Sequence, residues 1–421
     1  MTKLRGKLYP LAPWAAGVLI ALMGTPAGAV DLKTADGAWT FSIDGNVNVH
    51  YIYSKCENSP SAVDGGLACT GTASGSNVSN IGNGLLPAAF TFAVATTQGG
   101  YDLSAHLGLF PGIATNDGGS PNLQANGAGN TALGTTGLDV RQVYLTFGNK
   151  DIGTFLFGRN FGLFGFDAII NDMTLPGVGG AGSASGPAPA NTTLGSIGLG
   201  YIYVDTLAQM DYTTPDFSGA NFTIGIFDPI TALAGGGGIP AGKKAPGFHG
   251  KLAWTMPINS TTKFYGSATF ITQKQNFDTG PTTAYDYNGT GFDVFAKIDV
   301  QDFEGFAYYY HGSGLGTTGL FIRSADALGN TRDSDGFLVQ ATYKVGQVKF
   351  GVNYGESKLD LANAADSPTL VSKNRKVTGG VYDSLTKNLT LLAEVTDVKA
   401  DAHNGNSNKS TNFNVGAFLS F

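Results

Sequence analysis

The sequence predicts an all-β protein, a 16-stranded antiparallel transmembrane β-barrel, and three observations lead to that prediction. Short segments alternate apolar and polar residues with a period of two. Tight turns and long polar loops follow one another along the chain. Only 13% of the residues are charged, about half the usual share for a soluble protein. After residue 29, no apolar run reaches the length of a membrane-spanning helix.

The first 29 residues are predicted to be a leader that is removed on export. A basic start precedes an apolar run from Leu11 to Met23, and Ala27-Gly28-Ala29 fits a small-residue cleavage site. The apolar run is shorter than the roughly 20 residues that a spanning helix needs. We therefore expect a signal peptide at 1–29 and a single barrel domain at 30–421. Loss of the basic start makes the formal net charge more negative than the −6 of the whole chain.

The connections between the predicted strands alternate between short and long. Tight turns are expected at 98–100, 149–151, 215–219, 257–260, 301–302, 345–347 and 386–388. Long loops are expected at 54–85, 111–137, 162–197, 229–246, 275–289, 314–334, 359–373 and 400–410. Seven turns and eight loops connect sixteen strands, which is the layout of a bacterial outer-membrane barrel.

The two faces of each predicted strand differ in polarity. In the first strand, Val47, Val49 and Tyr51 alternate with Asn48 and His50. Sixteen strands enclose a lumen too wide for side chains to fill, so the polar face lines water. Closure is required because an unpaired strand edge cannot survive in lipid. A soluble β-sandwich or β-helix is the alternative for the same pattern, but aromatic strand ends and long polar loops favour the membrane.

The remaining composition excludes several classes of function. Cys56 and Cys69 are the only cysteines, and in an oxidising compartment we expect them to form a disulfide that closes a loop. A metal site would need more ligands than this pair offers. The five histidines are scattered, and no nucleophile, metalloprotease or phosphate-binding motif is present. We therefore predict no enzyme activity, no metal and no cofactor, and the acidic balance argues against nucleic acid.

One stretch resembles a known family. It contains Val140-Arg141-Gln142-Val143-Tyr144-Leu145, then Gly153 to Gly162 with Gly158-Arg159-Asn160-Phe161-Gly162, then Leu175-Pro176 and Gly179-Gly180. This stretch is similar to strand 4, strand 5 and the constriction loop of the general Gram-negative trimeric porins. Weaker similarity continues through Val204–Tyr212, Pro215–Gly219 and Tyr382–Leu389 to the terminal Phe421.

The resemblance implies a function, a fold detail and partners. It implies a passive diffusion channel for ions and small hydrophilic solutes in the outer membrane of a Gram-negative bacterium, with loop 3 folded into the lumen. The partners would be two further copies in a homotrimer, outer-membrane lipid and lipopolysaccharide, the solutes themselves, and the outer-membrane assembly machinery, which would recognise Phe421.

The resemblance also implies which residues line the constriction. Asp172 and Asp167 would be loop carboxylates, and Arg141 and Arg159 would be basic residues across from them. Each has a plainer alternative. The aspartates could cap the loop, Arg141 could form an ordinary salt bridge, and Arg159 could hold the loop root or a subunit contact. Asp205 stands where the family often has a basic wall residue.

The chain departs from the family in its charges. Family members often carry a second loop carboxylate in Pro-Glu-Phe, where this chain has Pro176-Gly177-Val178. Neutral or acidic residues replace several wall arginines, at Ala88-Ala89-Phe90 and at Asp205. We therefore predict a weaker transverse field and a mild preference for cations.

Two other functions stay open at this point. A substrate-selective channel could use Tyr308-Tyr309-Tyr310 as a sugar slide if these rings faced the lumen, although an aromatic girdle is the favoured role. A structural or adhesive surface barrel would have a plugged lumen and loops that bind partners.

Overall fold

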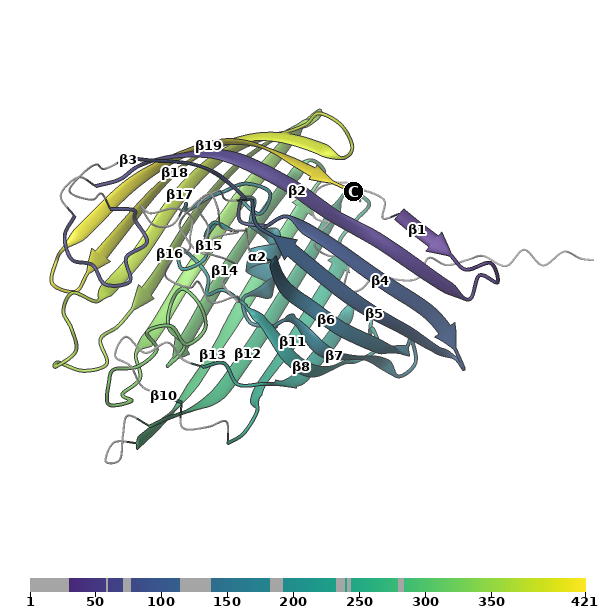
Figure 1. Ribbon diagram of the computed structural model, residues 1–421, viewed down its shortest axis with the longest axis horizontal. Helices are drawn as coiled ribbons and strands as arrows, with labels where there is room; N and C mark the ends of the chain where they lie inside the picture. Colours follow the sequence, from purple (N-terminus) through teal and green to yellow (C-terminus); the bar gives the residue numbers. More distant parts are fainter. Residues whose placement is uncertain are drawn as a thin grey trace, which may run out of the picture.

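The chain forms a closed β-barrel (Figure 1). The computed structural model describes residues 30–57, 60–70, 77–113, 138–181, 192–231, 239–240, 244–278 and 284–421. The expected signal peptide lies outside these ranges. Within them, no helix has the length and hydropathy to cross a membrane.

The described residues form nineteen strands and one short helix. The strands of the first half are β1 (Val30–Lys33), β2 (Trp39–Lys55), β3 (Asn77–Gly82), β4 (Ala89–Gln98), β5 (Tyr101–Pro111), β6 (Leu138–Asn149), β7 (Gly153–Phe161), β8 (Thr206–Thr213), β9 (Ala220–Phe227) and β10 (Ile239–Pro240). Those of the second half are β11 (Gly247–Pro257), β12 (Thr262–Asp278), β13 (Ala284–Val300), β14 (Phe303–Ser313), β15 (Asp333–Val345), β16 (Val348–Leu359), β17 (Val371–Ser384), β18 (Leu389–Ala402) and β19 (Ser407–Ser420). The helix is α2 (Phe166–Asn171), between β7 and β8.

The nineteen strands occupy sixteen positions in the barrel wall. β3 and β4 pair with different halves of β2 and form one interrupted wall strand. β10 and β11 likewise share the position beside β12, and β1 pairs with β2 beyond the end of β19. All pairs are antiparallel, and β19 pairs with β2 to close the barrel. The predicted 16-stranded fold is confirmed.

The connections alternate in length as predicted, but two of the long loops are mostly strand. β12 and β13 stay paired out to Asp278 and Ala284, which leaves a short connection where a loop was expected over 275–289. β18 and β19 stay paired out to Asp401 and Ser407. Both hairpin ends are rich in Asn, Asp and Lys, so the sequence pattern did not distinguish a projecting ladder from a loop.

The wall has an apolar outer face and a polar inner face. On β2, Val47, Val49 and Tyr51 are exposed while Asn48 and His50 are buried. The tyrosine run on β14 is split between the two faces. Tyr309 is exposed, but Tyr308 and Tyr310 are buried with the inner series. The predicted girdle role is therefore wrong for Tyr308 and Tyr310, because consecutive strand residues point to opposite faces.

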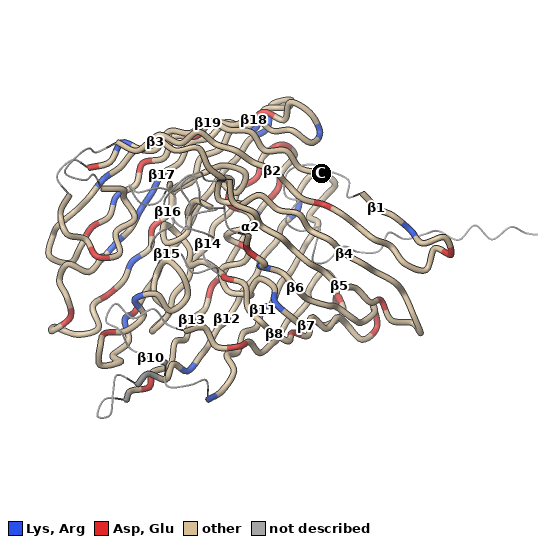
Figure 2. Tube along the Cα trace, viewed as in Figure 1, with Lys and Arg blue, Asp and Glu red and all other residues tan. Residues whose placement is uncertain are grey.

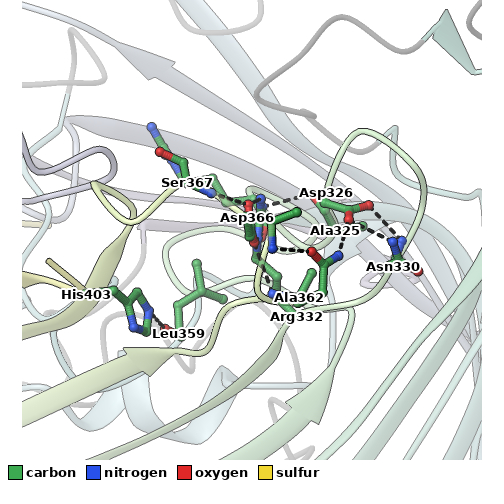
Figure 3. A network of polar contacts seen from close by, with 12 residues as sticks. Ala325, Asp326, Asn330, Arg332, Leu359, Ala362, Asp366, Ser367 and His403 are labelled. Carbon is green, nitrogen blue, oxygen red and sulfur yellow. Dashed lines mark hydrogen bonds and ion pairs between the residues drawn. The ribbon is translucent and has the colours of Figure 1, made fainter.

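The loops at the long-loop end of the barrel are joined to one another. Cys56 and Cys69 form the predicted disulfide. Arg332 donates two hydrogen bonds to the Asp366 carboxylate, at 2.7 and 2.8 Å, and a third to the Ala325 carbonyl (Figure 3). His403, after β18, contacts the Leu359 carbonyl at 2.8 Å (Figure 3). The connections that follow β14, β16 and β18 thus support each other.

Candidate functional site

The candidate site is built around the connection between β7 and β8, residues 162–205, which we call the β7–β8 segment. Its start is fixed by α2, which is preceded by Gly165 with a φ of 78°. This left-handed conformation favours glycine. It aims the Gly165 N–H at the Asp293 carboxylate on β13, 2.7 Å away. The start of α2 is thereby bonded to a strand that is distant in the sequence, and α2 is drawn among the barrel strands in Figure 1.

Asp167, the second residue of α2, binds three side chains of the wall. Its carboxylate lies 2.6 Å from the Lys251 ammonium on β11. It also accepts hydrogen bonds from the hydroxyls of Tyr265 and Ser267 on β12. All these side chains are largely buried, so the charge of Asp167 is compensated by the wall.

Asp172 follows α2 and organises the next part of the segment. One carboxylate oxygen accepts hydrogen bonds from the Thr174 N–H and hydroxyl, at 3.0 and 2.8 Å. The same oxygen accepts from the Asn353 amide on β16 at 3.1 Å, and the other oxygen from the Tyr201 hydroxyl at 3.2 Å. Asp172 therefore caps a turn, links the two arms of the segment and reaches the wall.

Glu394 on β18 supplies a carboxylate where the segment has none. It accepts hydrogen bonds from the N–H groups of Val178 and Gly179, at 2.8 and 2.9 Å, and from the Tyr382 hydroxyl at 2.7 Å. A Cβ atom on Gly177 would overlap this carboxylate. The wall thus places an acid beside the position at which the resemblance expected one from the loop.

The segment also binds the gap between β3 and β4. The Leu85 and Leu86 N–H groups donate to the carbonyls of Gly177 and Leu175, at 2.8 and 3.1 Å. The Asn48 side chain on β2 fills the gap in the ladder, because its amide bonds the Leu86 carbonyl and its oxygen accepts from the Gly84 N–H. The wall strand formed by β3 and β4 is therefore interrupted at Leu85 and Leu86, where its backbone bonds the β7–β8 segment in place of a neighbouring strand.

Arg141, Arg159 and Asp205 lie near the root of the segment. A register shift in the β5–β6 ladder at Arg141 puts both Arg141 and Asp139 on the buried inner face. The Arg141 guanidinium bonds Asp139 at 3.0 Å, and its central carbon lies 5.5 Å from the Phe110 ring centroid. Burial raises the pKa of the Asp205 carboxyl, while the Thr206 N–H and the charges of Arg159 and Arg141 oppose that rise. These three predicted residues therefore share one electrostatic neighbourhood.

The strand register gives Arg159 a different orientation from that of Arg141. Arg159 lies opposite Val143 on β6 and Ala208 on β8, and both neighbours are exposed on the outer face. Its place in this series agrees with the alternative role at a subunit contact. Its charge still acts on Asp205 from the end of β7.

The five predicted residues thus form one group and two separate anchors. Arg141 and Arg159 act on Asp205 through their charges although they belong to opposite faces of the wall, whereas Asp167 and Asp172 bind different parts of the wall. Two wall residues that hold the segment were not predicted from the sequence: Lys251, which pairs with Asp167, and Glu394, which accepts the Val178 and Gly179 N–H groups. Period-two alternation places both on the inner face, but it cannot tell which wall residue the segment meets. Within the described residues, no cluster of His, Cys, Asp or Glu could hold a metal ion.

Similarity to solved structures supports the fold over nearly the whole chain. The outer-membrane channel DcaP of Acinetobacter baumannii is 16% identical with a TM-score of 0.62, and the match covers 93% of this chain and 99% of that one. An anion-selective porin from Comamonas acidovorans is 13% identical with a TM-score of 0.57, covering 91% and 100%. OmpT of Vibrio cholerae in its trimer form is 14% identical with a TM-score of 0.53, covering 91% and 100%.

Sequence comparison gives the family. Among curated proteins, no sequence matches the chain significantly. The sequence pattern of the Gram-negative porins matches residues 15–418, which is most of the chain. Together with the closed barrel, this match makes the protein an outer-membrane diffusion channel. The chain belongs to the Gram-negative porin family.

Proposed function

We propose that the β7–β8 segment lies across the lumen as the constriction of a passive channel for ions and small polar solutes. The main support is that this one segment forms hydrogen bonds with inward-facing residues of β11, β12, β13, β16 and β18. It also bonds the backbone of Leu85 and Leu86, after β3. A segment with partners on so many wall strands narrows the water-filled space that they enclose. Transport would need only the pore geometry and its fixed charge, with no reaction and no cofactor.

The selectivity that we propose is a mild preference for cations. Lys251 neutralises Asp167, and Asp139 neutralises Arg141, so neither member of the expected transverse pair acts alone. On the wall of β2, β5 and β6, inward groups include the Asp44 carboxylate and a hydrogen-bonded chain of His106, Ser104 and Thr146. This wall is neutral to acidic, as is the whole chain.

Reversal potentials under a KCl gradient test the selectivity. We expect a potential of the sign given by faster potassium than chloride permeation. The variant Asp44→Asn should move that potential toward zero, whereas Lys150→Gln, in an exposed turn, should not. A potential that favours chloride in the unmodified channel would contradict the cation preference without affecting the channel function.

We further propose that the protein works as a homotrimer in contact with outer-membrane lipid and lipopolysaccharide. The trimeric state of a protein with the same fold and the outward position of Arg159 support a subunit contact. Phe421 is proposed as the signal for the assembly machinery. Its backbone pairs with Gly45 at 2.9 and 3.0 Å, and its ring lies 5.4 Å from Phe90, so the terminus also joins the wall.

A plugged, structural barrel is the second candidate, and one observation favours it. A large apolar cluster joins the β7–β8 segment and the connection after β14 to the inner face of β12–β15, and it includes Phe164, Tyr201 and Phe321. Planar-bilayer recording separates the two candidates. The channel should insert in conductance steps, commonly in threes, while a plugged barrel would give none. Liposome swelling with graded sugars should depend on size without saturation, whereas saturation would show a substrate-selective channel.

A further inference from the structure

The outer surface of β17, β18 and β19 carries a row of three cations. Strand register sets Arg375 opposite Lys399 and Lys399 opposite Lys409. Like charges that face each other across strands destabilise a sheet. Figure 2 shows Lys and Arg interleaved with Asp and Glu toward the long-loop end of the barrel. A nearby anion would reduce the repulsion among these three cations.

The carboxylates of the wall compensate this row only in part. Asp401 lies 2.6 Å from the Lys399 ammonium and 4.0 Å from the Arg375 guanidinium. The Glu57 carboxylate accepts a hydrogen bond from the Lys409 backbone N–H at 3.2 Å, but within the described part of the chain no carboxylate lies within ion-pair distance of the exposed Lys409 ammonium. Asp397, one step closer to the apolar band, accepts a hydrogen bond from the Thr411 hydroxyl at 2.6 Å and could accept another from a hydroxyl of a bound headgroup.

A groove in the wall surrounds the three cations. It has a volume of about 320 Å³, and its lining includes Tyr354, Arg375, Lys399, Lys409 and Thr411 together with one carboxylate, that of Asp397. The same strands carry a second groove of about 460 Å³, whose lining includes Tyr51, Gly379, Val381, Val395 and Phe413. Val381, Val395 and Phe413 are 41–45% exposed, so this second groove opens on the apolar outer face.

Glycine forms the floor of the apolar groove. An added Cβ on Gly379 would meet nothing within 4 Å, so the missing side chain leaves open space between the strands' outer residues. Gly379 follows Arg375 by four positions, or roughly 13 Å of strand. The apolar groove therefore lies directly beside the cationic groove, on the side of the short turns.

We propose that the two grooves together bind one outer-leaflet lipid whose headgroup carries phosphate, with an acyl chain in the apolar groove and the phosphate at Arg375, Lys399 and Lys409. The order of the grooves matches the order of tail and headgroup in a membrane, because long loops face outside the cell in such barrels. Clustered Lys and Arg at headgroup level attract anionic lipid. This proposal rests on the outer-membrane location and gives a specific site to the lipid partner proposed above.

Native mass spectrometry of the delipidated, detergent-solubilised protein tests the site. The probe is dimyristoyl phosphatidic acid, compared with dimyristoyl phosphatidylcholine and with inorganic phosphate alone. We expect the phosphatidic acid to bind most tightly. The triple variant Arg375→Gln, Lys399→Gln, Lys409→Gln should bind it about a hundredfold more weakly, as expected for three cations at a membrane surface. Gly379→Leu, which fills the apolar groove, should weaken both lipids.

Two control variants make the same kinds of change, loss of a cation and addition of apolar bulk, away from the proposed site. Lys150→Gln removes a cation from a turn at the other end of the barrel, and Ala268→Leu adds the same bulk to the exposed outer face of β12. Neither should change lipid binding. If the triple variant does not fold, Lys409→Gln alone should still lower the affinity severalfold, because this ammonium is exposed.

Four outcomes would overturn the proposal. Equal binding to the unmodified and triple-variant protein would remove the cations from the site, and equal binding of the Gly379→Leu variant would remove the apolar groove. Effective competition by inorganic phosphate at the concentration of the lipid would identify a free-anion site. Loss of the oligomer in the triple variant would assign this face to a second copy of the chain. Channel conductance of the variants should stay normal, so failure here is distinct from failure of the channel function.

Discussion

Replacing Glu394 with alanine should release the tip of the β7–β8 segment from the wall. The carboxylate receives two backbone N–H groups, from Val178 and Gly179, within 2.9 Å, and it is 2% exposed. Buried donors that lose their acceptor cannot turn to bulk water. A hydrogen bond to a charged group contributes about 1.5–3 kcal/mol, so loss of the two backbone bonds alone weakens the anchor by about 3–6 kcal/mol.

An effect of this size is visible in single channels. A loss of about 3–6 kcal/mol raises the population of the released tip by roughly two to four powers of ten. We expect Glu394→Ala to flicker between conductance levels in planar bilayers, with a mean conductance different from that of the unmodified channel. Glu394→Gln keeps an oxygen for the two N–H groups and should stay close to normal. Asp102→Ala removes an exposed rim carboxylate that is bonded to Thr97, and it should give steady currents.

Two results would refute this reasoning. Steady, unchanged currents from Glu394→Ala would show that the tip does not depend on this carboxylate. Equal flicker in Glu394→Gln and Glu394→Ala would show that the negative charge, rather than hydrogen-bond acceptance, holds the segment. A test of folding by heat-dependent mobility on gels accompanies both, so that a misfolded barrel is not taken for a released tip.

Two further changes should lower the stability of the folded protein. Lys251→Met leaves the Asp167 carboxylate buried without its cation, which costs about 3–5 kcal/mol; the midpoint of thermal unfolding should fall, and adding Asp167→Asn should restore part of it. Arg332 lowers the pKa of Asp366 to about 2, below its ordinary value of 3.8. The carboxylate therefore stabilises the folded loops above about pH 4, and this is lost as the pH falls through about 2. Pepsin should cut the loops readily at pH 1.5 but not at pH 3.5, whereas Asp366→Asn should be cut at both.

The barrel itself could be predicted from local patterns. Alternation along a strand and the spacing of turns are properties of neighbouring residues, so they are readable before any strand is paired. The Cys56–Cys69 disulfide was accessible for the same reason, since its ends are 13 residues apart. The two projecting hairpins were harder, because their polar residues carry no face preference that would mark them as strand.

The anchors of the β7–β8 segment could not be predicted in the same way. Asp167 and Lys251 are 84 positions apart, and Val178 and Glu394 are 216 apart, so their contacts depend on the tertiary structure and not on local sequence. The resemblance to the porins identified Asp167 and Asp172 as candidate loop carboxylates, but it did not identify the side chains that bind them. Local alternation also missed the register shift that puts Arg141 and Asp139 together on the inner face, because one extra residue reverses the face of the strand residues before it.

The interrupted strand formed by β3 and β4 has a consequence for assembly. Residues 175–179 bond the backbone of Leu85 and Leu86 beside β2, and Glu394 beside β19. These two contacts stand on opposite sides of the junction where the first and last strands of the wall meet. Separation of β2 from β19 would therefore also have to break the hydrogen bonds of residues 175–179 on one side or the other. Substitutions that release this part of the segment would therefore also make β2 and β19 easier to separate. Changes in conductance and changes in barrel stability should then occur in the same variants.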